Sequence, residues 1–375
     1  MADLVALDLP GGPPFVAALR AVWDRGDAAV PVDQRLPAVR RADLVAAMAP
    51  ARSIGPDGRE RACTGEHRPV APGDALVVAT SGSTGSPKGV VLTHAAVTAH
   101  ARAVHERLEV DARRDRWLAC LPLAHVGGLG VVTRALVGGI GLDVGAGFDA
   151  AVVDAAPKRL GSTLTSLVPT ALDRVDPDRW RVVVLGGSGD RRARGPNVIH
   201  TYGLTETGGG VVYDRGGPLA GTEVRVVDGE IEVRGPTLLR CYRDGTDPRR
   251  SDGWLPTGDL GSFDHDGALV VQGRADDLIV TGGENVWPDA VEAVVGRHPR
   301  VLDVAVAGRP DDEWGQTVVA FVVPRQGLDP PTLAGVRALV KTDLPAFAAP
   351  RDLVLVDSVP RTALGKIRRD LLPDL

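Results

Sequence analysis

Lysine is scarce in this chain of 375 residues. Only four lysines are present, at positions 88, 158, 341 and 366, so that 39 of the 43 basic residues are arginines. Acidic residues number 48 and the net charge is −5, which excludes the strong positive field of many nucleic-acid-binding domains. Because lysine is so rare, the position of each one carries more information than usual.

Cysteine is also rare, and long apolar runs are missing. The three cysteines, Cys63, Cys120 and Cys241, lie far apart without a CxxC spacing, so we expect neither a zinc site nor a disulfide framework. No apolar run approaches the ~18 residues that a membrane-spanning helix needs. The first residues include Asp3 and Asp8 and lack the basic stretch of a signal peptide. These absences predict a cytoplasmic protein without a membrane span.

The length and the apolar pattern predict an α/β protein with two domains. From Ala75 to Gly187, short apolar strands alternate with helical segments, which is typical of layered α/β sheets. After residue 218 the pattern changes to short strands joined by Asp-Gly turns, which indicates an antiparallel β-region. We predict a large N-terminal domain over residues 1–275 and a small α+β C-terminal domain over residues 276–375. Within the first, residues 1–50 are expected to be helical and residues 51–74 to form a loop.

A glycine-rich loop at residues 80–89 reads TSGSTGSPKG and follows a strand-like run. Glycines let the backbone approach an anion, and hydroxyls and a lysine add donors for phosphate oxygens. A flexible Ser/Gly linker is the alternative, but linkers seldom lie between two apolar strands. Since Lys88 is followed by Gly89, the loop is not a Walker A motif. The predicted phosphate-binding residues are Thr80, Ser81, Gly82, Ser83, Thr84, Gly85 and Lys88.

Three later segments carry groups that suit a nucleotide. In HTYGLTETGGG, an aromatic ring can stack on adenine and Glu206 can hold Mg²⁺, although a capped helix start would look similar. In WLPTGD, Asp259 can accept hydrogen bonds from both ribose hydroxyls, although a plain turn aspartate is the alternative. In PRTALGK, Lys366 would by default be a solvated lysine.

In this order, these segments resemble the motifs of the adenylate-forming superfamily, which includes acyl- and aryl-CoA ligases, peptide-synthetase adenylation domains and beetle luciferases. The resemblance extends from Ala75 to Lys366. It implies that Tyr202 packs on adenine, that Thr205 contacts the α-phosphate and that Glu206 binds magnesium. The other nucleotide-binding residues that it implies are Gly186, Gly187, Gly203, Asp259 and Arg274.

The resemblance also implies the reaction and a mobile C-terminal lid. A carboxylic acid and ATP would form an acyl-adenylate, and coenzyme A would then take the acyl group, with ATP, Mg²⁺ and coenzyme A as cofactors. Lys366 would be the catalytic lysine between the acid and the α-phosphate. The C-terminal domain would rotate about Asp276, and a loop with Gly282 and Gly283 would enter the coenzyme A tunnel.

The sequence indicates the identity of the carboxylic acid substrate less directly than it indicates the reaction. His125 lies in PLAHVGG, which resembles a segment of aryl-CoA ligases where the histidine borders the carboxylate site; a structural histidine is the alternative. Only about eighty residues precede the phosphate loop, and this compactness, with His125 and TSLVPTAL, resembles the o-succinylbenzoate–CoA ligases of menaquinone biosynthesis. The second carboxylate of that substrate needs a cation or hydroxyls. The candidates are Arg134, Ser166 and Thr170.

Other readings stay open at this point. The chain could be another aryl- or acyl-CoA ligase, or a stand-alone adenylating enzyme that loads an acyl carrier protein. A non-catalytic nucleotide-binding protein of the same fold is disfavoured because Lys366, Glu206 and Asp259 are all present. The expected partner is a small carboxylic acid; we expect no nucleic acid, and a homodimer is left open.

Overall fold

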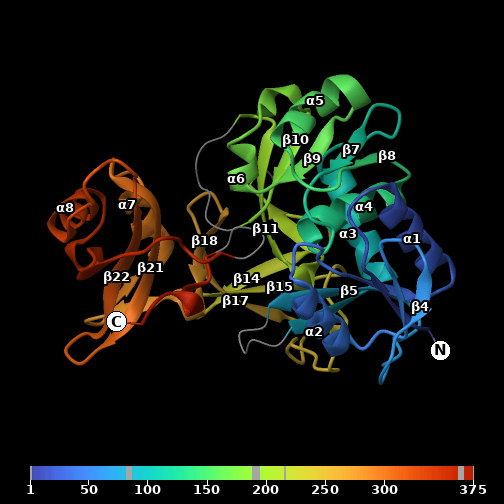
Figure 1. Ribbon diagram of the computed structural model, residues 1–375, viewed down its shortest axis with the longest axis horizontal. Helices are drawn as coiled ribbons and strands as arrows, with labels where there is room; N and C mark the ends of the chain where they lie inside the picture. Colours follow the sequence, from blue (N-terminus) through green and yellow to red (C-terminus); the bar gives the residue numbers. More distant parts are fainter. Residues whose placement is uncertain (1, 82–86, 188–194, 215–216, 362–366, 375) are drawn as a thin grey trace. The chain divides into compact units, whose positions relative to one another are not determined.

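The structure, a computed structural model, describes residues 2–81, 87–187, 195–214, 217–361 and 367–374. Helices and strands follow one another along the chain (Figure 1), which confirms the predicted α/β class. The chain forms two compact units. The first comprises Met1–Arg225 and Glu232–Thr257, and the second comprises Val226–Ile231 and Gly258–Leu375. The boundary predicted between residues 275 and 276 stays a prediction.

The first unit contains a seven-stranded sheet with the order β16-β6-β5-β2-β1-β3-β4. β1 is parallel to β2 and β3, and β2 is parallel to β5. β4, β6 and β16 are antiparallel to their neighbours. The strands are β1 (Leu4–Leu7), β2 (Ala28–Pro31), β3 (Arg52–Ile54), β4 (Glu60–Ala62), β5 (Asp74–Ser81), β6 (Pro87–Thr93) and β16 (Cys241–Tyr242).

Two of these strands correct the prediction that residues 1–50 are helical. β1 (LVAL) and β2 (AAVP) are buried at every position. Parallel strands covered on both faces produce such apolar runs, which periodicity cannot distinguish from a buried helix. The remainder of the segment does form helices, α1 (Pro13–Asp24) and α2 (Ala38–Met48). The loop predicted over residues 51–74 contains β3 and β4 at the edge of the sheet.

A second seven-stranded sheet of the first unit has the order β13-β12-β11-β10-β9-β7-β8. Its central strands are parallel, and β12 and β13 are antiparallel additions. The parallel strands alternate with helices along the chain, as predicted. The strands are β7 (Arg116–Ala119), β8 (Gly141–Val144), β9 (Leu164–Leu167), β10 (Val182–Leu185), β11 (Val198–Leu204), β12 (Gly209–Tyr213) and β13 (Gly217–Pro218).

Two helices form a layer between these sheets (Figure 1). α3 (His94–Arg107) contacts β5 and β6, α4 (Val126–Gly138) contacts β7 and β9, and the two helices contact each other. On the outer faces, α2 packs against the first sheet, and α5 (Ala150–Leu160) packs against the second. α4 is apolar nearly all round because it is covered on both sides. Three short helical turns complete the unit: α6 (Pro169–Leu172), η1 (Pro177–Arg179) and η2 (Thr205–Thr207).

The predicted antiparallel β-region is a four-stranded sheet with the order β14-β15-β17-β18. Asp228 and Gly229, at the tip of the first hairpin, both have positive φ angles of 50° and 85°, as a type I′ turn requires. The division between the two units passes through this sheet. The strands are β14 (Glu223–Val227), β15 (Glu230–Arg234), β17 (Leu255–Phe263) and β18 (Leu269–Arg274).

The rest of the second unit is an α+β fold, as predicted. β21 and β22 form a long antiparallel pair, β19 and β20 extend it, and β23 pairs with β22 in parallel. Val304 and Val306 face α7 and α8, whereas Ala305 and Ala307 face the C-terminal segment, so both faces of the sheet are covered. The elements are η3 (Ala275–Asp277), β19 (Ile279–Thr281), β20 (Glu284–Val286), α7 (Pro288–Val295), β21 (Val301–Asp311), β22 (Gly315–Pro324), α8 (Leu333–Asp343), η4 (Ala346–Ala348), β23 (Asp352–Leu355) and η5 (Arg369–Leu371).

Across the described ranges, no helix is both long enough and apolar enough to cross a bilayer.

Candidate active site

The predicted phosphate loop joins two antiparallel strands. β5 and β6 pair up to Ser81 and Pro87, and Thr80 lies opposite Lys88. The hydroxyl of Thr80 donates to the carbonyl oxygen of Lys88 at 3.4 Å. The loop therefore begins and ends at the same point of the sheet, and the Lys88 side chain is exposed there. The predicted residues Gly82, Ser83, Thr84 and Gly85 lie outside the described residues.

Lys88 and Glu206 both contact a tyrosine that the sequence analysis did not select. Tyr242 lies on β16, which pairs with β6. Its hydroxyl donates to Oε1 of Glu206 at 3.0 Å, and Nζ of Lys88 lies 5.3 Å from the centre of its ring. The structure thus brings the predicted phosphate lysine and the predicted magnesium ligand to one side chain.

The segment with Tyr202, Thr205 and Glu206 is a strand followed by a single 3₁₀ turn. This arrangement replaces the helix start that was the alternative for these residues. Gly203 lies at an irregularity in the pairing of β11 with β12, and a Cβ there would be 2.0 Å from the carbonyl oxygen of Gly209. Only glycine therefore fits at position 203. The backbone amide of Leu239 donates to the carbonyl oxygen of Glu206 at 2.7 Å and fixes the turn.

The predicted adenine-binding glycines follow the neighbouring strand. β10 and β11 are parallel, with Leu185 in register with His200. Gly187 and Tyr202 therefore come two residues later in each chain segment, at the carboxyl ends of adjacent strands, where open α/β sheets bind ligands. Gly187 has a φ of 99°, and the amide of Gly186 donates to the carbonyl oxygen of Leu167.

His125 has a buried acidic partner. It lies at the N-cap of α4, and its Nε2 is 3.1 Å from Oδ2 of Asp33, which follows β2. Nε and NH2 of Arg35 donate to the two oxygens of the same carboxylate at 2.9 and 2.7 Å. Burial alone would raise the pKa of Asp33, but the hydrogen bonds from Arg35 and His125 outweigh it and hold the pKa far below its usual range. Asp33 is therefore ionised and orients the imidazole.

Arg134 is a buried cation beside Ser166. Its NH2 donates to Oγ of Ser166 at 3.0 Å, its Nε donates to the carbonyl oxygen of Gly130 at 2.7 Å, and its Cζ lies 4.6 Å from the ring centre of Trp117. The residue is 4% exposed, and within the described ranges it forms no ion pair. Thr170 lies on α6, is exposed, and has no described contact with Arg134 or Ser166.

Two histidines near Arg134 are neutral at pH 7. Burial, followed by the charge of Arg134, lowers the pKa of both His100 and His105 to about 4. Nε2 of His100 lies 3.0 Å from the carbonyl oxygen of Gly210, and Nε1 of Trp117 donates to Nε2 of His105 at 3.3 Å. Among these three side chains, Arg134 is therefore the charged one.

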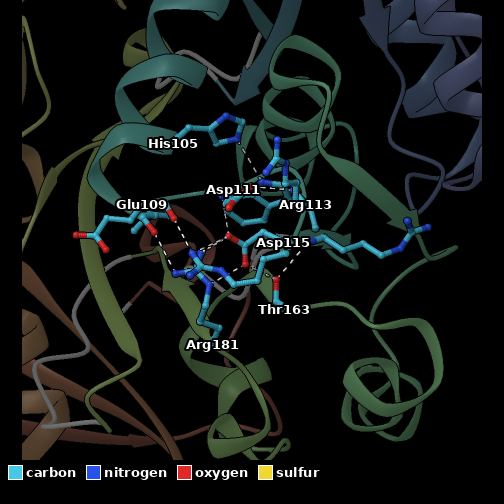
Figure 2. A network of polar contacts seen from close by, with 11 residues as sticks. His105, Glu109, Asp111, Arg113, Asp115, Thr163 and Arg181 are labelled. Carbon is cyan, nitrogen blue, oxygen red and sulfur yellow. Dashed lines mark hydrogen bonds and ion pairs between the residues drawn. The ribbon is translucent and has the colours of Figure 1, made fainter.

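An ionic network holds the strand that carries Trp117. Figure 2 shows Asp115, which immediately precedes β7, in contact with Arg181, Thr163 and Asp111. Arg181 donates to both carboxylate oxygens of Asp115, at 2.7 and 2.8 Å. Thr163 immediately precedes β9, and Arg181 immediately precedes β10. The network therefore aligns the starts of the neighbouring strands β7, β9 and β10.

The second unit brings Asp259 and Arg274 together. They are paired across β17 and β18, and NH1 of Arg274 donates to Oδ1 of Asp259 at 3.1 Å. Asp259 is buried, with 8% exposure. Asp276, the predicted hinge residue, is exposed in the 3₁₀ turn η3, directly after β18.

The predicted coenzyme A loop is the turn between β19 and β20. Gly282 and Gly283 have φ angles of 58° and 83°, which favour glycine. A Cβ on Gly282 would lie 2.7 Å from the ring of Trp314, and Arg351 stacks on that ring with its Cζ at 3.9 Å. Lys366 lies outside the described residues, between the described positions Arg361 and Ile367, which form an isolated bridge.

Asp33 and Tyr242 are the site residues that the sequence analysis missed. Asp33 follows a buried parallel strand, a position where open α/β sheets place functional groups, so recognising β2 would have drawn attention to it. Tyr242 gave no local signal, because its partners lie in other segments.

Comparisons with known proteins identify the family of this chain. A model for the "AMP-binding enzyme" family matches residues 48–243, and one for the "AMP-binding enzyme C-terminal domain" matches residues 290–366. The probable 2-succinylbenzoate–CoA ligase of Mycobacterium tuberculosis is 44% identical over 323 residues, which cover 80% of this chain and 83% of that protein. The 2-succinylbenzoate–CoA ligase of Listeria monocytogenes is 33% identical over 330 residues, covering 80% of this chain and 70% of that protein.

The solved structures include o-succinylbenzoate coenzyme A synthetase (MenE) from Bacillus subtilis in complex with the acyl-adenylate intermediate OSB-AMP. It superposes with a TM-score of 0.86 at 28% identity, over 100% of this chain and 88% of the other. The same enzyme in complex with ATP and magnesium ion also has a TM-score of 0.86 at 28% identity, over 99% of this chain and 89% of the other. These matches confirm the resemblance and the fold that the motifs indicated.

Proposed function

This chain belongs to the family of AMP-binding enzymes and is an AMP-forming acid–thiol ligase, and we propose that the acid it activates is o-succinylbenzoate, which it converts to o-succinylbenzoyl-CoA. The names of the relatives from Mycobacterium tuberculosis and Listeria monocytogenes support this substrate. Among the observations on this chain, the strongest support is the buried guanidinium of Arg134, which has no acidic partner among the residues that the structure describes.

In the first step, a carboxylate oxygen of the acid attacks the α-phosphorus of ATP. The new O–P bond gives the acyl-adenylate, and the bond to the β-phosphate breaks to release pyrophosphate. Because both reactants are anions, the protein must offset their repulsion. Lys88 and the amides of residues 80–85 would surround the polyphosphate. Lys366 would bridge the acid and the α-phosphate, so that both are held at reacting distance.

The residues around Glu206 fit a magnesium ion that arrives with ATP. Mg²⁺ is usually held by one or two carboxylates and the phosphates of its substrate. Glu206 offers one carboxylate, of which Oε1 accepts from Tyr242. Within the described ranges, no group of three or more His, Cys, Asp or Glu side chains could hold a resident metal. When bound, the ion would neutralise charge on the phosphates.

In the second step, the thiol of coenzyme A releases its proton to water and the sulfur attacks the acyl carbon. The C–S bond forms, the bond to AMP breaks, and AMP leaves as the second product. We assign the adenosine to Tyr202, Gly186, Gly187, Asp259 and Arg274, and the approach of the thiol to the turn with Gly282 and Gly283. Between the two steps, the C-terminal domain would rotate about Asp276, so that Lys366 leaves the reacting atoms and this turn takes its place.

The second carboxylate of o-succinylbenzoate suits the surroundings of Arg134. A buried charge without a counter-charge costs several kcal/mol of folding free energy, unless a ligand supplies the opposite charge. His100 and His105 are neutral there, so they do not compete for an anion. The ring carboxylate, which is not activated, would accept from Arg134 and Ser166, while His125 borders the reacting carboxylate.

A pyrophosphate-release screen tests the substrate. We expect kcat/KM for o-succinylbenzoate to exceed that for its analogue without the ring carboxylate by on the order of 100-fold or more, because the analogue leaves buried donors unpaired. The screen also includes benzoate, malonate and medium-chain fatty acids. Arg134→Met should remove most of this preference. Arg174→Met is the matched control, because Arg174 also stacks on an aromatic ring, Phe148, but is exposed.

Equal turnover of the acid and its analogue would contradict the proposed substrate. Thioester formation with free coenzyme A would identify coenzyme A as the acyl acceptor. If turnover instead requires an acyl carrier protein, that protein is the acceptor. We further propose a cytoplasmic location, which the three free cysteines support. A homodimer stays a prediction that sedimentation can test.

A further inference from the structure

We propose that Tyr242 is a positioning residue for the nucleotide site, which orients Glu206 with its hydroxyl and holds the Lys88 ammonium on its ring. This inference rests on the proposed function, because it takes Lys88 and Glu206 as ligands of the magnesium–triphosphate. Tyr242 lies outside the glycine-rich loop motif of Lys88 and outside the motif that contains Glu206.

The two contacts of Tyr242 are of different kinds. Its hydroxyl donates to Oε1 of Glu206 at 3.0 Å, and a hydrogen bond to an ionised carboxylate is stronger than one between neutral groups. Nζ of Lys88 lies 5.3 Å from the ring centre, within the range of a cation–π interaction. One side chain therefore contacts both charged groups.

This arrangement keeps Lys88 and Glu206 from neutralising each other. Both residues are described, and no ion pair is formed between them. A direct salt bridge would have to be broken before a triphosphate or a cation could bind. On Tyr242 the ammonium is held by a weaker attraction to the ring, which positions it and leaves it able to bind phosphate oxygens.

The contact also leaves half of the Glu206 carboxylate available. Only Oε1 accepts from Tyr242, and the described residues supply no partner for Oε2. Groups that bond to a metal ligand without touching the metal fix its orientation and typically change metal affinity 10- to 100-fold. Tyr242 occupies that position relative to Glu206.

The backbone of Tyr242 is fixed on both sides. Nε and NH2 of Arg240 each donate at 2.8 Å to an oxygen of Asp74, which is buried. Arg243 is also buried and donates to the carbonyl oxygens of Met48 and Pro69, each at 3.0 Å. Tyr242 thus projects from a strand whose flanking side chains are locked, which is what a positioning residue requires.

Two substitutions separate the contacts. Tyr242→Phe removes the hydroxyl and keeps the ring, whereas Tyr242→Leu removes both. Thr246→Ala is the control, because Thr246 is exposed in the same turn, its side chain bonds to Asp244, and the substitution keeps the backbone oxygen that accepts from the amide of Tyr242. Glu206→Gln is the reference for loss of the magnesium ligand. ATP binding to the full chain is measured by calorimetry without acid, over a series of Mg²⁺ concentrations, and melting temperatures are recorded for all variants.

We expect Tyr242→Phe to raise the Mg²⁺ concentration for half-maximal ATP affinity about tenfold, in the same direction as Glu206→Gln. ATP affinity at saturating Mg²⁺ should be unchanged in Tyr242→Phe and about threefold weaker in Tyr242→Leu, where the ring is lost. Thr246→Ala should change neither quantity. Melting temperatures close to that of the unsubstituted chain would show that the effect lies at the site.

Three outcomes would overturn the inference. If Glu206→Gln shifts the magnesium requirement and Tyr242→Phe does not, the positioning role is wrong while the proposed function stands. If neither variant shifts it, the assignment of Glu206 fails, and the role of Tyr242 fails with it. An equal shift in Thr246→Ala would mean that any change in this turn disturbs the site.

Discussion

Nε2 of His125 lies 3.1 Å from Oδ2 of Asp33, so a buried carboxylate on the first sheet orients a half-buried imidazole at the start of α4. The carboxylate is ionised because hydrogen bonds from Arg35 and His125 keep its pKa low against the effect of burial. An ionised carboxylate can only accept, so Nε2 is the donor, and this contact fixes the orientation of the ring. The role proposed for His125, beside the reacting carboxylate, requires such a fixed position.

Asp33→Asn tests this relationship. The amide keeps the size of the carboxylate but loses its charge, which weakens a charge-assisted hydrogen bond. We expect kcat/KM for o-succinylbenzoate to fall about tenfold, mainly through kcat, with ATP affinity unchanged. Asp43→Asn is the control, because it makes the same change at an exposed carboxylate that pairs with Arg40. If Asp43→Asn lowers kcat as much as Asp33→Asn does, the orientation of His125 is not the cause.

Gly282→Ala tests the turn assigned to the thioester step. A Cβ at Gly282 would meet the Trp314 ring at 2.7 Å, in a backbone conformation that already disfavours alanine. We expect thioester formation to fall about tenfold or more, while pyrophosphate release in the absence of coenzyme A stays within about threefold. Both half-reactions are measured by rapid quench.

The adjacent glycine supplies the matched control for that experiment. Gly283 also has a positive φ, but a Cβ there would meet no atom within 4 Å. Gly283→Ala should therefore carry only the backbone strain, which is about 1 kcal/mol. Equal loss of both half-reactions in Gly282→Ala would contradict a specific role of this turn in the second step.

The motifs whose residues are contiguous could be predicted from the sequence. Thr80 and Lys88 face each other because they end two strands of one hairpin, and Tyr202 and Glu206 occupy one strand and its following turn. Within such a segment, the spacing of the residues largely fixes the geometry. The change to an antiparallel β-region after residue 218 was visible for the same reason, since its turns are local.

Contacts between distant segments could not be predicted. Tyr242 reaches Glu206 only because β16 is added to the edge of the first sheet beside β6. Asp33 reaches His125 because α4 packs between two sheets. The strands β1 and β2 were missed because burial on both faces removes the alternation that identifies a strand. Each of these features depends on tertiary packing, which a single sequence does not encode locally.

Lys366→Ala tests the proposed catalytic lysine, a residue that lies outside the described ranges. If the Lys366 ammonium offsets repulsion between the acid and the α-phosphate, its loss should lower pyrophosphate release about 100-fold or more. ATP affinity should stay within about threefold, since Lys88 and Glu206 are intact. Lys341→Ala, an exposed lysine on α8, is the control from the same unit. Pyrophosphate release near the normal rate in Lys366→Ala would contradict its role.

Glu292 predicts a pH dependence of stability in the second unit. Arg369 is shared by three carboxylates, with NH2 at 2.7 Å from Asp289 and 2.8 Å from Glu292, and NH1 at 3.5 Å from Asp277. Burial raises the pKa of Glu292 from 4.5 to about 7, and the charge of Asp289 adds to this, although Arg369 acts in the opposite direction. One guanidinium cannot compensate all three acids, so Glu292 takes up a proton more readily in the folded state.

The sign of the effect follows from this raised pKa. Between pH 4.5 and 7 the folded state binds more protons at Glu292 than the unfolded state does, so the free energy of unfolding falls as the pH rises through this range. From about one pH unit above that pKa the contribution is constant and lower by about 3 kcal/mol. Glu292→Gln cannot ionise and should remove this slope. Hydrogen exchange of the α7 amides at pH 5 and pH 8 measures this pH dependence of stability locally. Glu313→Gln is the control, because Glu313 is exposed. The same pH dependence in Glu292→Gln as in the unsubstituted chain would contradict the prediction.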